Sequence, residues 1–216
     1  MRVTSAPSPT LELEREAFAR GAACVAGIDE VGRGALAGPV MVGVVIVNLS
    51  TIEPPIGLRD SKLLTAKARQ NLVPMVESWA VSHAIGAASN VEIDKLGIIG
   101  ALKLASHRAL VKVGLRPDIV ILDGKHDWLS GPPRMPKVMM QIKGDQHCAS
   151  IAAASVLAKQ YRDAHMTRLA PRYPQYALEH NKGYGSAEHL AALQEHGPAQ
   201  CHRRSWNLPG IGSMGE

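Results

Sequence analysis

Two adjacent carboxylates, Asp29 and Glu30, follow a short apolar run and are followed in turn by Gly32-Arg33-Gly34. The run, residues 24–28, is partly β-branched and bounded by glycine, which is typical of a buried strand. Carboxylates there are costly unless water, a cation or a hydrogen-bond donor compensates them. The glycines allow close approach of another molecule, and an arginine between them suits an anion. A strand that ends in a solvated turn would explain the two acids but not the Gly-Arg-Gly that follows them. The pattern favours a divalent metal ion on one side and a phosphate on the other.

Acids recur at the ends of other predicted strands. Asp123 ends an apolar segment, and Asp145 follows another. If these strands neighbour the first, four carboxylates meet at one edge of a sheet, where open α/β sheets place their active sites. Oxygen donors without histidine or cysteine suit Mg²⁺ or Mn²⁺, and two such ions roughly 4 Å apart can promote phosphodiester hydrolysis. Each acid alone is also explained as a solvated strand end or a helix cap, Asp145 most of all.

The adjacency of Asp29 and Glu30 poses a geometric problem. Successive side chains of a strand point to opposite faces of the sheet. The two carboxylates therefore share one site only if the strand ends or twists at this point. Gly32 and Gly34 make such a twist feasible.

The elements that must position these residues follow from the apolar pattern. Nearly all-apolar strands with helices between them indicate an α/β fold whose helices cover the faces of a sheet. We predict strands at residues 24–28, 40–47, 79–89, 117–124 and 137–143. We predict helices at residues 11–20, 66–78, 91–113 and 150–169. We expect Thr65 to cap the second helix, which Pro74 would kink or end early, and Asn90 or Asp94 to cap the third.

Changes in composition divide the chain into three parts. Residues 1–20 contain a Pro- and Ser-rich tail, over residues 1–10, and a short helix. Residues 21–174 carry the predicted sheet and every acid singled out above. Residues 175–216 mix helix and loop and form an appended helical lobe.

Composition narrows the class of partner. The 216 residues carry a net charge of +5, which favours a polyanion. Three cysteines without CxxC spacing imply neither a disulfide framework nor a zinc site.

The most apolar stretch, residues 35–47, contains Pro39 and is too short to span a bilayer, and the N-terminus has no secretory signal pattern. We expect a cytoplasmic protein with no membrane partner.

Several motifs together resemble the type 2 ribonucleases H, and within them bacterial ribonuclease HII. The resemblance covers nearly the whole chain after residue 24, and it depends on the order and spacing of the motifs. They are Gly27-Ile28-Asp29-Glu30-Val31-Gly32-Arg33-Gly34, Asp60-Ser61-Lys62, Asp123-Gly124, Lys143-Gly144-Asp145, Ser150 to Ser155 with Lys159, Asn181-Lys182-Gly183-Tyr184-Gly185-Ser186 and His202-Arg203-Arg204-Ser205-Trp206.

The resemblance implies a ribonuclease H-like mixed sheet flanked by helices, with a small C-terminal helical lobe. It implies an endoribonuclease that cleaves RNA in RNA–DNA hybrids and incises duplex DNA 5′ to an embedded ribonucleotide, using two Mg²⁺ or Mn²⁺ ions. We expect a monomer. The implied metal ligands and catalytic residues are Asp29, Glu30, Asp123 and Asp145. The implied substrate-binding residues are Gly32, Arg33 and Gly34, which read the 2′-hydroxyl and a phosphate, and Tyr184, which stacks by the sugar at the RNA–DNA junction.

Three alternatives compete with this interpretation. A resolvase-like or exonuclease-like nuclease would also use four acids but has no need to sense a 2′-hydroxyl. Ribonuclease HIII carries an extra N-terminal domain, for which the residues before the first strand leave no room. A catalytically silent nucleic-acid-binding module predicts the loss of at least one acid, and all four are present.

Some charged residues stay open at this point. Lys62 and Lys143 are equally explained as phosphate contacts or as solvated side chains. Arg203 and Arg204 would either bind the duplex or pair with acids of the main domain, and Asp163 favours a helix-surface ion pair over a metal site. No catalytic role is assigned to His126, His147 or His189.

Overall fold

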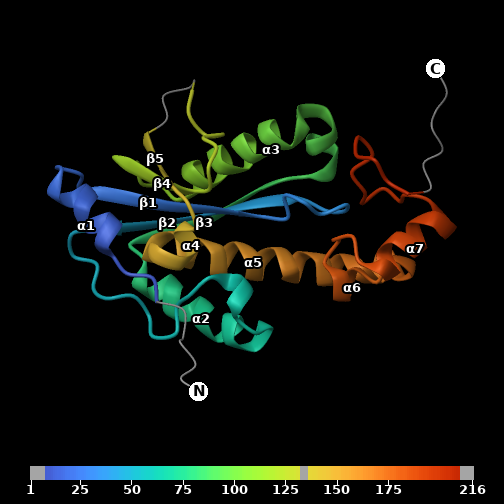
Figure 1. The fold of residues 1–216 in the computed structure, drawn as a ribbon, viewed down its shortest axis with the longest axis horizontal. Coiled ribbons are helices and arrows are strands. Elements are labelled where there is room, and N and C mark those ends of the chain that lie inside the picture. Colours follow the sequence, from blue (N-terminus) through green and yellow to red (C-terminus); the bar gives the residue numbers. More distant parts are fainter. Residues whose placement is uncertain (1–7, 132–135, 210–216) are drawn as a thin grey trace.

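The computed structural model describes residues 8–131 and 136–209 (Figure 1), so most of the tail predicted over residues 1–10 lies outside the described chain. The last residue of that segment is fixed. The Thr10 N–H donates to the His147 carbonyl at 3.0 Å, and the Thr10 carbonyl accepts from the Ala149 N–H at 2.9 Å.

A mixed sheet forms the centre of the molecule, with the strand order β3-β2-β1-β4-β5. Its strands are β1 Cys24–Val31, β2 Val40–Asn48, β3 Ser82–Ala88, β4 Ile119–Asp123 and β5 Lys137–Gln141. β2 pairs antiparallel with both β1 and β3, whereas β1, β4 and β5 run parallel. All five predicted strands are present, and β2 pairs with β1 as expected. β1 extends beyond the predicted range and includes both Asp29 and Glu30.

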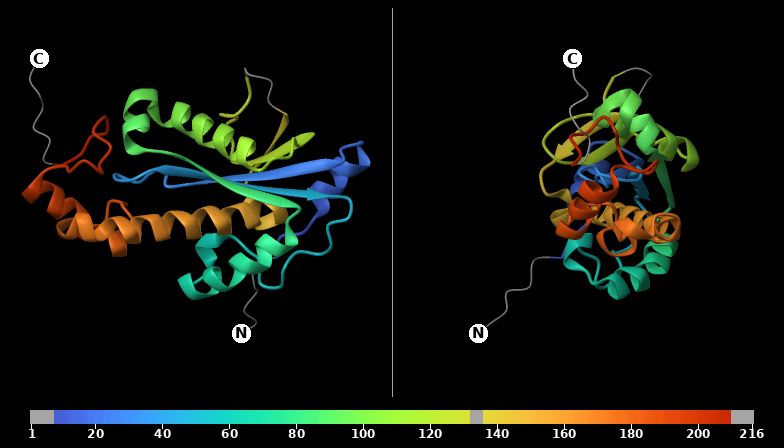
Figure 2. Two further views of the ribbon diagram at one scale, coloured as in Figure 1. Left: turned by 180° about the vertical axis from the view of Figure 1, so that it is seen from behind. Right: turned by 90° about the vertical axis from the view of Figure 1, so that its right-hand side faces the viewer.

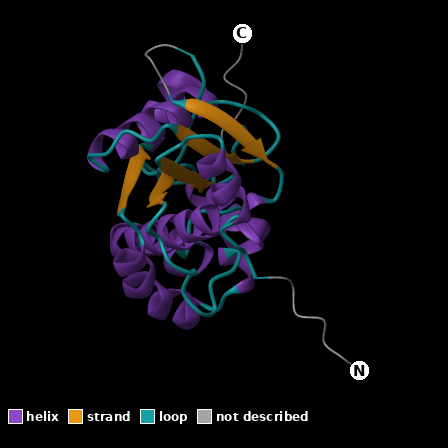
Figure 3. Ribbon diagram, turned by 90° about the vertical axis from the view of Figure 1, so that its left-hand side faces the viewer, coloured by secondary structure: helices purple, strands orange, loops and turns teal. Residues whose placement is uncertain are grey.

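Helices cover both faces of the sheet (Figures 1 and 3). The longer ones are α1 Glu12–Ala19, α2 Ala66–Trp79, α3 Asn90–Lys112, α5 Ala149–Leu169 and α7 Ala187–His196. The short ones are α4 Gly144–His147, α6 Leu178–Asn181 and the 3₁₀ turns Ser61–Leu63, Ala170–Arg172 and Pro174–Tyr176. One apolar core joins the sheet to α3, and another joins it to α2 and α5. β2 is buried along its length up to Asn48, which explains its continuous apolar sequence. The predicted α/β class is confirmed.

Helix starts match the predictions in one case and correct them in another. The Thr65 side chain accepts the Ala68 N–H at 3.2 Å and caps α2, which continues past Pro74 instead of ending early. The expectation that Asn90 or Asp94 caps α3 is wrong. Ser89 is the cap, because its hydroxyl accepts the Glu92 N–H while the Glu92 carboxylate accepts the Ser89 N–H. This reciprocal pair is a capping box, whose Ser-x-x-Glu signature was visible in the sequence.

α5 lies unusually close to β1 and β2 because glycines face it. A Cβ on Gly27 would lie 2.3 Å from the Ser150 carbonyl carbon, and one on Gly43 would lie 2.4 Å from the Ala154 carbonyl oxygen. The facing part of α5 is rich in alanine, so the helix axis approaches the strands closely. This contact fixes α5 against the end of β1 that carries the acids.

The C-terminal elements form a third apolar core. α5 extends past the sheet toward α6 and α7, as the left-hand view in Figure 2 shows. Met166 in its last turns packs with Tyr176, Leu193 and Cys201, and also with Ala37 from the loop after β1. This core therefore ties the residues after α5 to the loop after β1, at Leu36 and Ala37. The division of the chain at residue 174 stays a prediction.

Candidate active site

Asp29 and Glu30 both border one cavity of about 440 Å³. Asp29 is only 6% exposed, and its Oδ1 accepts the Glu30 N–H at 2.9 Å. Glu30 is partly exposed, with Arg33 Nη1 3.4 Å from its Oε1. The geometric problem posed by adjacent strand residues is therefore resolved at the end of β1, where the chain turns at Gly32 with a φ of 82°.

Asp123 reaches the same cavity from β4. β1 and β4 pair in parallel with Ile28 opposite Leu122, so the next residues, Asp29 and Asp123, lie near each other at the same end of the sheet. The Gly144 N–H donates to Asp123 Oδ1 at 2.7 Å, which ties this carboxylate to the start of α4.

Asp145 lies beside this group in the first turn of α4 and is 3% exposed. It is not among the residues that border the cavity. It is linked to the cavity through Lys62, whose Nζ lies 3.2 Å from Asp145 Oδ2. The structure thus places three of the four predicted acids on the cavity and the fourth behind Lys62.

The clustered carboxylates disturb one another. Burial, and then the charge of Glu30, raise the pKa of Asp29 well above its usual value, while a hydrogen bond with Ser155 opposes this. Burial raises the pKa of Glu30 against the opposing effect of Arg33. Burial and the charge of Asp60 raise the pKa of Asp145, while Lys62 lowers it. A bound cation would relieve this mutual repulsion.

The donor set fits a hard divalent cation, since it offers carboxylate oxygens and concentrated negative charge. Within the described residues, no three His, Cys, Asp or Glu side chains are already arranged so as to hold an ion. Instead, Arg33 and Lys62 lie against Glu30 and Asp145. The site is therefore chemically suited to Mg²⁺ or Mn²⁺, with its acids held apart by protein contacts.

Two fully buried arginines support the Gly-Arg-Gly loop from behind. Arg203 donates from Nη2 to the Gly32 carbonyl at 2.6 Å and from Nη1 to the Arg33 carbonyl at 2.8 Å. Arg162 donates to the carbonyls of Ala37 and Pro39 further along the loop. In a planar trans peptide the N–H points opposite to the carbonyl. The N–H groups of Arg33 and Gly34 therefore point away from Arg203.

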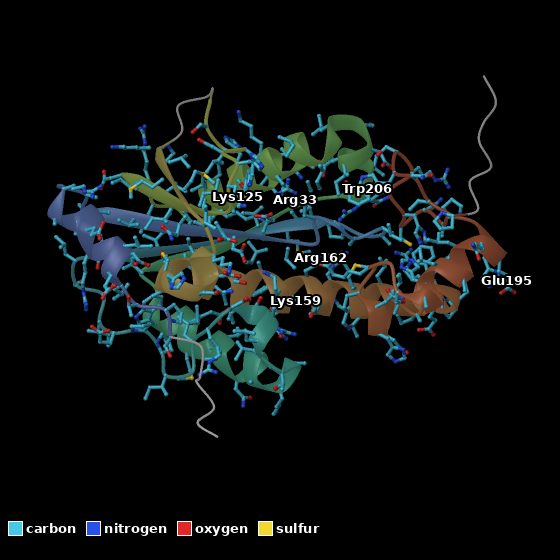
Figure 4. The ribbon with its side chains drawn as sticks, viewed as in Figure 1. Arg33, Lys125, Lys159, Arg162, Glu195 and Trp206 are labelled. Carbon is cyan, nitrogen blue, oxygen red and sulfur yellow. The ribbon has the colours of Figure 1, made fainter. Side chains whose placement is uncertain are left out.

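Tyr184 lies at the same cavity although it is far away in sequence. Its hydroxyl accepts the Gly32 N–H at 3.1 Å. The guanidinium of Arg162 lies 5.2 Å from the centre of its ring, and Lys159 Nζ lies 5.8 Å from it. Figure 4 shows Arg33 above Arg162 and Lys159, which project from α5, in the middle of the molecule. The structure thus brings Tyr184 and the Gly-Arg-Gly loop together.

The open charged residues now have places. Arg203 is 0% exposed and donates to backbone carbonyls, so neither a duplex nor an acid is its partner. The Arg204 backbone N–H donates to Asp94, and its side chain is exposed. Asp163 does form ion pairs, with Lys159 at 2.6 Å and Arg69 at 3.2 Å, but it is largely buried instead of lying on the surface.

Sequence reasoning gave no individual role to four residues near the acids. Lys159 and Ser155 border the cavity from α5. Ser155 also shares a hydrogen bond of 2.8 Å with Ser61. Asp60 is 5% exposed and accepts the Lys62 N–H at 2.9 Å. Its charge raises the pKa of Asp145, so it is a fifth carboxylate near that residue. The motifs that contain these residues were visible, but their contacts with the acids depend on the packing of α5.

The strand order β3-β2-β1-β4-β5, with acids at the same end of β1 and β4, is that of the ribonuclease H-like folds. The family model described as Ribonuclease HII matches residues 26–208. The chain therefore belongs to the ribonuclease HII family.

Individual comparisons agree. The chain is 51% identical to a Ribonuclease HII of Streptomyces coelicolor over 199 residues, which are 92% of this chain and 83% of the relative. The crystal structure of the ribonuclease H2 from Pyrococcus horikoshii has a TM-score of 0.64 at 23% identity, covering 85% of this chain and 94% of that one. Bst-RNase HIII, solved in complex with Mn²⁺, also has a TM-score of 0.64, at 22% identity, and the match covers 88% of this chain and 69% of that one. These two structures confirm the ribonuclease H-like fold.

Family membership determines the class of reaction. Ribonucleases HII are divalent-metal-dependent endoribonucleases that act on RNA–DNA hybrids, so this chain is an enzyme of that class. The resolvase-like and exonuclease-like alternatives are thereby set aside. In the part of the chain that the structure describes, no helix is long and apolar enough to cross a membrane.

Proposed function

We propose that this enzyme incises duplex DNA on the 5′ side of an embedded ribonucleotide, as well as cleaving longer RNA–DNA hybrids, by two-ion hydrolysis. One observation carries the proposal. The Tyr184 hydroxyl accepts the Gly32 N–H at 3.1 Å, at the cavity that Asp29, Glu30 and Asp123 border. A tyrosine and a glycine backbone, both suited to contact a sugar, thus lie beside the carboxylates.

The Gly-Arg-Gly loop is suited to recognise the 2′-hydroxyl. This group both donates and accepts hydrogen bonds, and it distinguishes RNA from DNA at a single position. Arg203 holds the carbonyls of Gly32 and Arg33, so the opposed N–H groups are available to an acceptor on the substrate. Apart from the glycine's own chain neighbours, no atom of the described residues lies within 4 Å of where a Cβ on Gly34 would be, which leaves room for a close approach.

Tyr184 is suited to test the neighbouring sugar. Its ring is held at the hydroxyl by Gly32 and is flanked by the cations of Arg162 and Lys159. A deoxyribose stacked on this ring would place the 3′ neighbour of the ribonucleotide, while Lys159 lies on the cavity as a counter-charge for a phosphate. Selection at the junction then depends on two sugars and not on base sequence.

Asp29, Glu30, Asp123 and Asp145 are the residues that we propose hold the ions. Divalent ions bound there would supply an activated water and stabilise the leaving oxygen. The protein's own part is to hold Asp29, Glu30 and Asp123 on one cavity and to orient the scissile phosphate against Lys62 and the Gly-Arg-Gly loop. The predicted monomeric state and cytoplasmic location belong to the same proposal, and sedimentation and cell fractionation test them.

The deciding experiment uses duplex DNA that carries one labelled ribonucleotide, with an all-DNA duplex as control, in Mg²⁺, Mn²⁺ or EDTA. We expect a metal-dependent nick on the 5′ side of the ribonucleotide and no cut in the control. Cleavage of long hybrids without cleavage at the single ribonucleotide would refute the proposed junction specificity. Equal cutting of the all-DNA control would refute recognition of the 2′-hydroxyl.

A further inference from the structure

Two histidines outside the cavity form a buried contact that the proposed chemistry does not use. His189 of α7 and His202 of the C-terminal segment are each 0% exposed. Their Nε2 atoms lie 3.0 Å apart. Two ring nitrogens at this distance share one proton in a hydrogen bond, so the protonation of one histidine determines that of the other.

The surrounding backbone fixes which nitrogen carries each proton. The Ala199 N–H donates to His202 Nδ1 at 3.0 Å, so this nitrogen is an acceptor and the proton of neutral His202 is on Nε2. His189 Nδ1 lies 2.8 Å from the Tyr184 carbonyl, which can only accept, so the proton of His189 is on Nδ1. His202 Nε2–H therefore donates to His189 Nε2, and every ring nitrogen has a partner.

The environment keeps both rings neutral. Burial lowers the pKa of His189, and burial together with the neighbouring His189 lowers the pKa of His202 to about 4. Tyr176 packs edge-on against His202 with the ring centres 4.6 Å apart. The Tyr176 hydroxyl donates elsewhere, to the Gly197 carbonyl at 2.6 Å, so it does not compete for the histidine nitrogens.

This chain of hydrogen bonds ends on the residue proposed to sense the sugar. Tyr184 is held at its hydroxyl by the Gly32 N–H and at its carbonyl by His189. His202 pairs as an isolated bridge with Ala37, in the loop that begins with Gly-Arg-Gly. The next residue, Arg203, donates a hydrogen bond to the Gly32 carbonyl. One short segment, residues 199–203, therefore supports both proposed recognition elements.

We propose that His189 and His202 are positioning residues for ribonucleotide recognition, and that their directed hydrogen bonds fix where Tyr184 lies at the cavity. This inference rests on the proposed function, because it assigns the histidines an effect through Tyr184. A purely structural role in the C-terminal core would instead lower stability and affect all substrates alike.

Cleavage kinetics separate these two roles. The quantity measured is the ratio of kcat/KM on duplex DNA with one ribonucleotide to kcat/KM on a long RNA–DNA hybrid. We expect His202→Phe to lower this ratio on the order of tenfold, as loss of a coupled contact does, and His202→Gln, whose amide both donates and accepts, to restore most of it. His180→Phe on exposed α6 is the matched control and should leave the ratio unchanged.

A double-mutant cycle tests whether the effect passes through Tyr184. In a Tyr184→Ala background, His202→Phe should lower the ratio no further, because there is no ring left to position. A full additional loss in that background would overturn the proposal. If Tyr184→Ala alone leaves the ratio unchanged, the proposed function of Tyr184 fails. If only the histidine variants leave it unchanged, the positioning role alone fails.

A spectrum of the wild-type enzyme covers the case in which a phenylalanine variant does not fold. Long-range ¹H–¹⁵N correlation on ¹⁵N-histidine protein distinguishes the Nδ1–H and Nε2–H tautomers. We expect neutral His189 with its proton on Nδ1 and neutral His202 with its proton on Nε2 at pH 7. A doubly protonated ring, or the same tautomer at both positions, would contradict the hydrogen-bond chain.

Discussion

Arg203 donates its Nη2 proton to the carbonyl of Gly32 over 2.6 Å, although the two residues are separated by most of the chain. The guanidinium is completely buried and is satisfied by backbone carbonyls instead of a carboxylate. Burial lowers its pKa to about 9, so it still carries its charge at neutral pH. The loop that begins at Gly32 is thus held from behind by a fixed fork of donors.

Arg203→Lys tests the importance of that fork. A lysine keeps the charge but cannot reproduce two planar donors, so the exchange is not conservative at this position. We expect kcat/KM at an embedded ribonucleotide to fall by one to two orders of magnitude and the free energy of unfolding to fall by about 2 kcal/mol. The same exchange at exposed Arg20 is the control, and equal effects at both sites would contradict the assignment.

The two loop glycines should respond differently to alanine. Beyond its chain neighbours, a Cβ on Gly34 would meet no atom of the described chain within 4 Å, whereas one on Gly32 would lie 2.0 Å from Arg162 Nε at a left-handed φ of 82°. We expect Gly34→Ala to keep the melting temperature within a few degrees and to lose most ribonucleotide cleavage, because the methyl group would occupy the path of the sugar. Gly32→Ala should lower both cleavage and stability. Full cleavage by Gly34→Ala would show that nothing approaches this backbone.

Much of the fold could be predicted because its signals are local. The nearly continuous β-branched run of β2 and the alanine-rich run of α5 each specify one element, and the structure contains both. The sequence did not predict that β1 continues through Asp29 and Glu30, because acids after an apolar run usually indicate the end of a strand. Asp29 is buried beside Ser155 of α5, and this helix approaches the strands closely at Gly27 and Gly43.

The sequence singled out the acids of the candidate site, but it did not reveal the contacts that support them. Asp29 and Asp123 share an edge because β1 and β4 are parallel neighbours, a pairing that the sequence raised only as a condition and did not predict. The hydrogen bond from Arg203 to the Gly32 carbonyl and that from His189 to the Tyr184 carbonyl leave no pattern in the neighbouring sequence. Both arise from long-range packing of the C-terminal core, which a single sequence does not reveal.

Lys62 should control the acid limb of the pH–rate profile. Burial and Asp60 raise the pKa of Asp145, while Lys62 lowers it, and Lys62 also lowers the pKa of Asp29. Removing the ammonium in Lys62→Met should therefore raise both pKa values. Since cleavage requires ionised carboxylates, we expect the acid limb of kcat/KM to move to higher pH. Lys67→Met, at an exposed position on α2, is the control, and an unmoved limb in Lys62→Met would contradict the coupling.

Asp29 should make the metal-free enzyme less stable as the pH rises. Its pKa in the folded protein lies well above that of an unfolded chain, so the folded state holds the proton over the interval between the two values. Stability therefore declines as pH rises through this interval, and the penalty is complete above the folded-state pKa. Asp29→Asn removes the charge. We expect it to abolish cleavage, to keep hybrid binding and to raise the melting temperature at pH 7 in EDTA.

Calorimetry with and without metal completes this test. A divalent ion that binds the folded state stabilises it, so Mg²⁺ or Mn²⁺ should raise the melting temperature of the wild type more than that of Asp29→Asn. Asp127 is a control whose pKa shifts in the opposite direction. Hydrogen bonds from Ser130 and Leu129 lower its pKa despite burial. Asp127→Asn should lower the melting temperature at pH 7 and leave the metal response intact. If Asp29→Asn were less stable than the wild type in EDTA, the charge of Asp29 would not destabilise the metal-free fold. If it responded to metal as strongly as the wild type, Asp29 would not be a metal ligand.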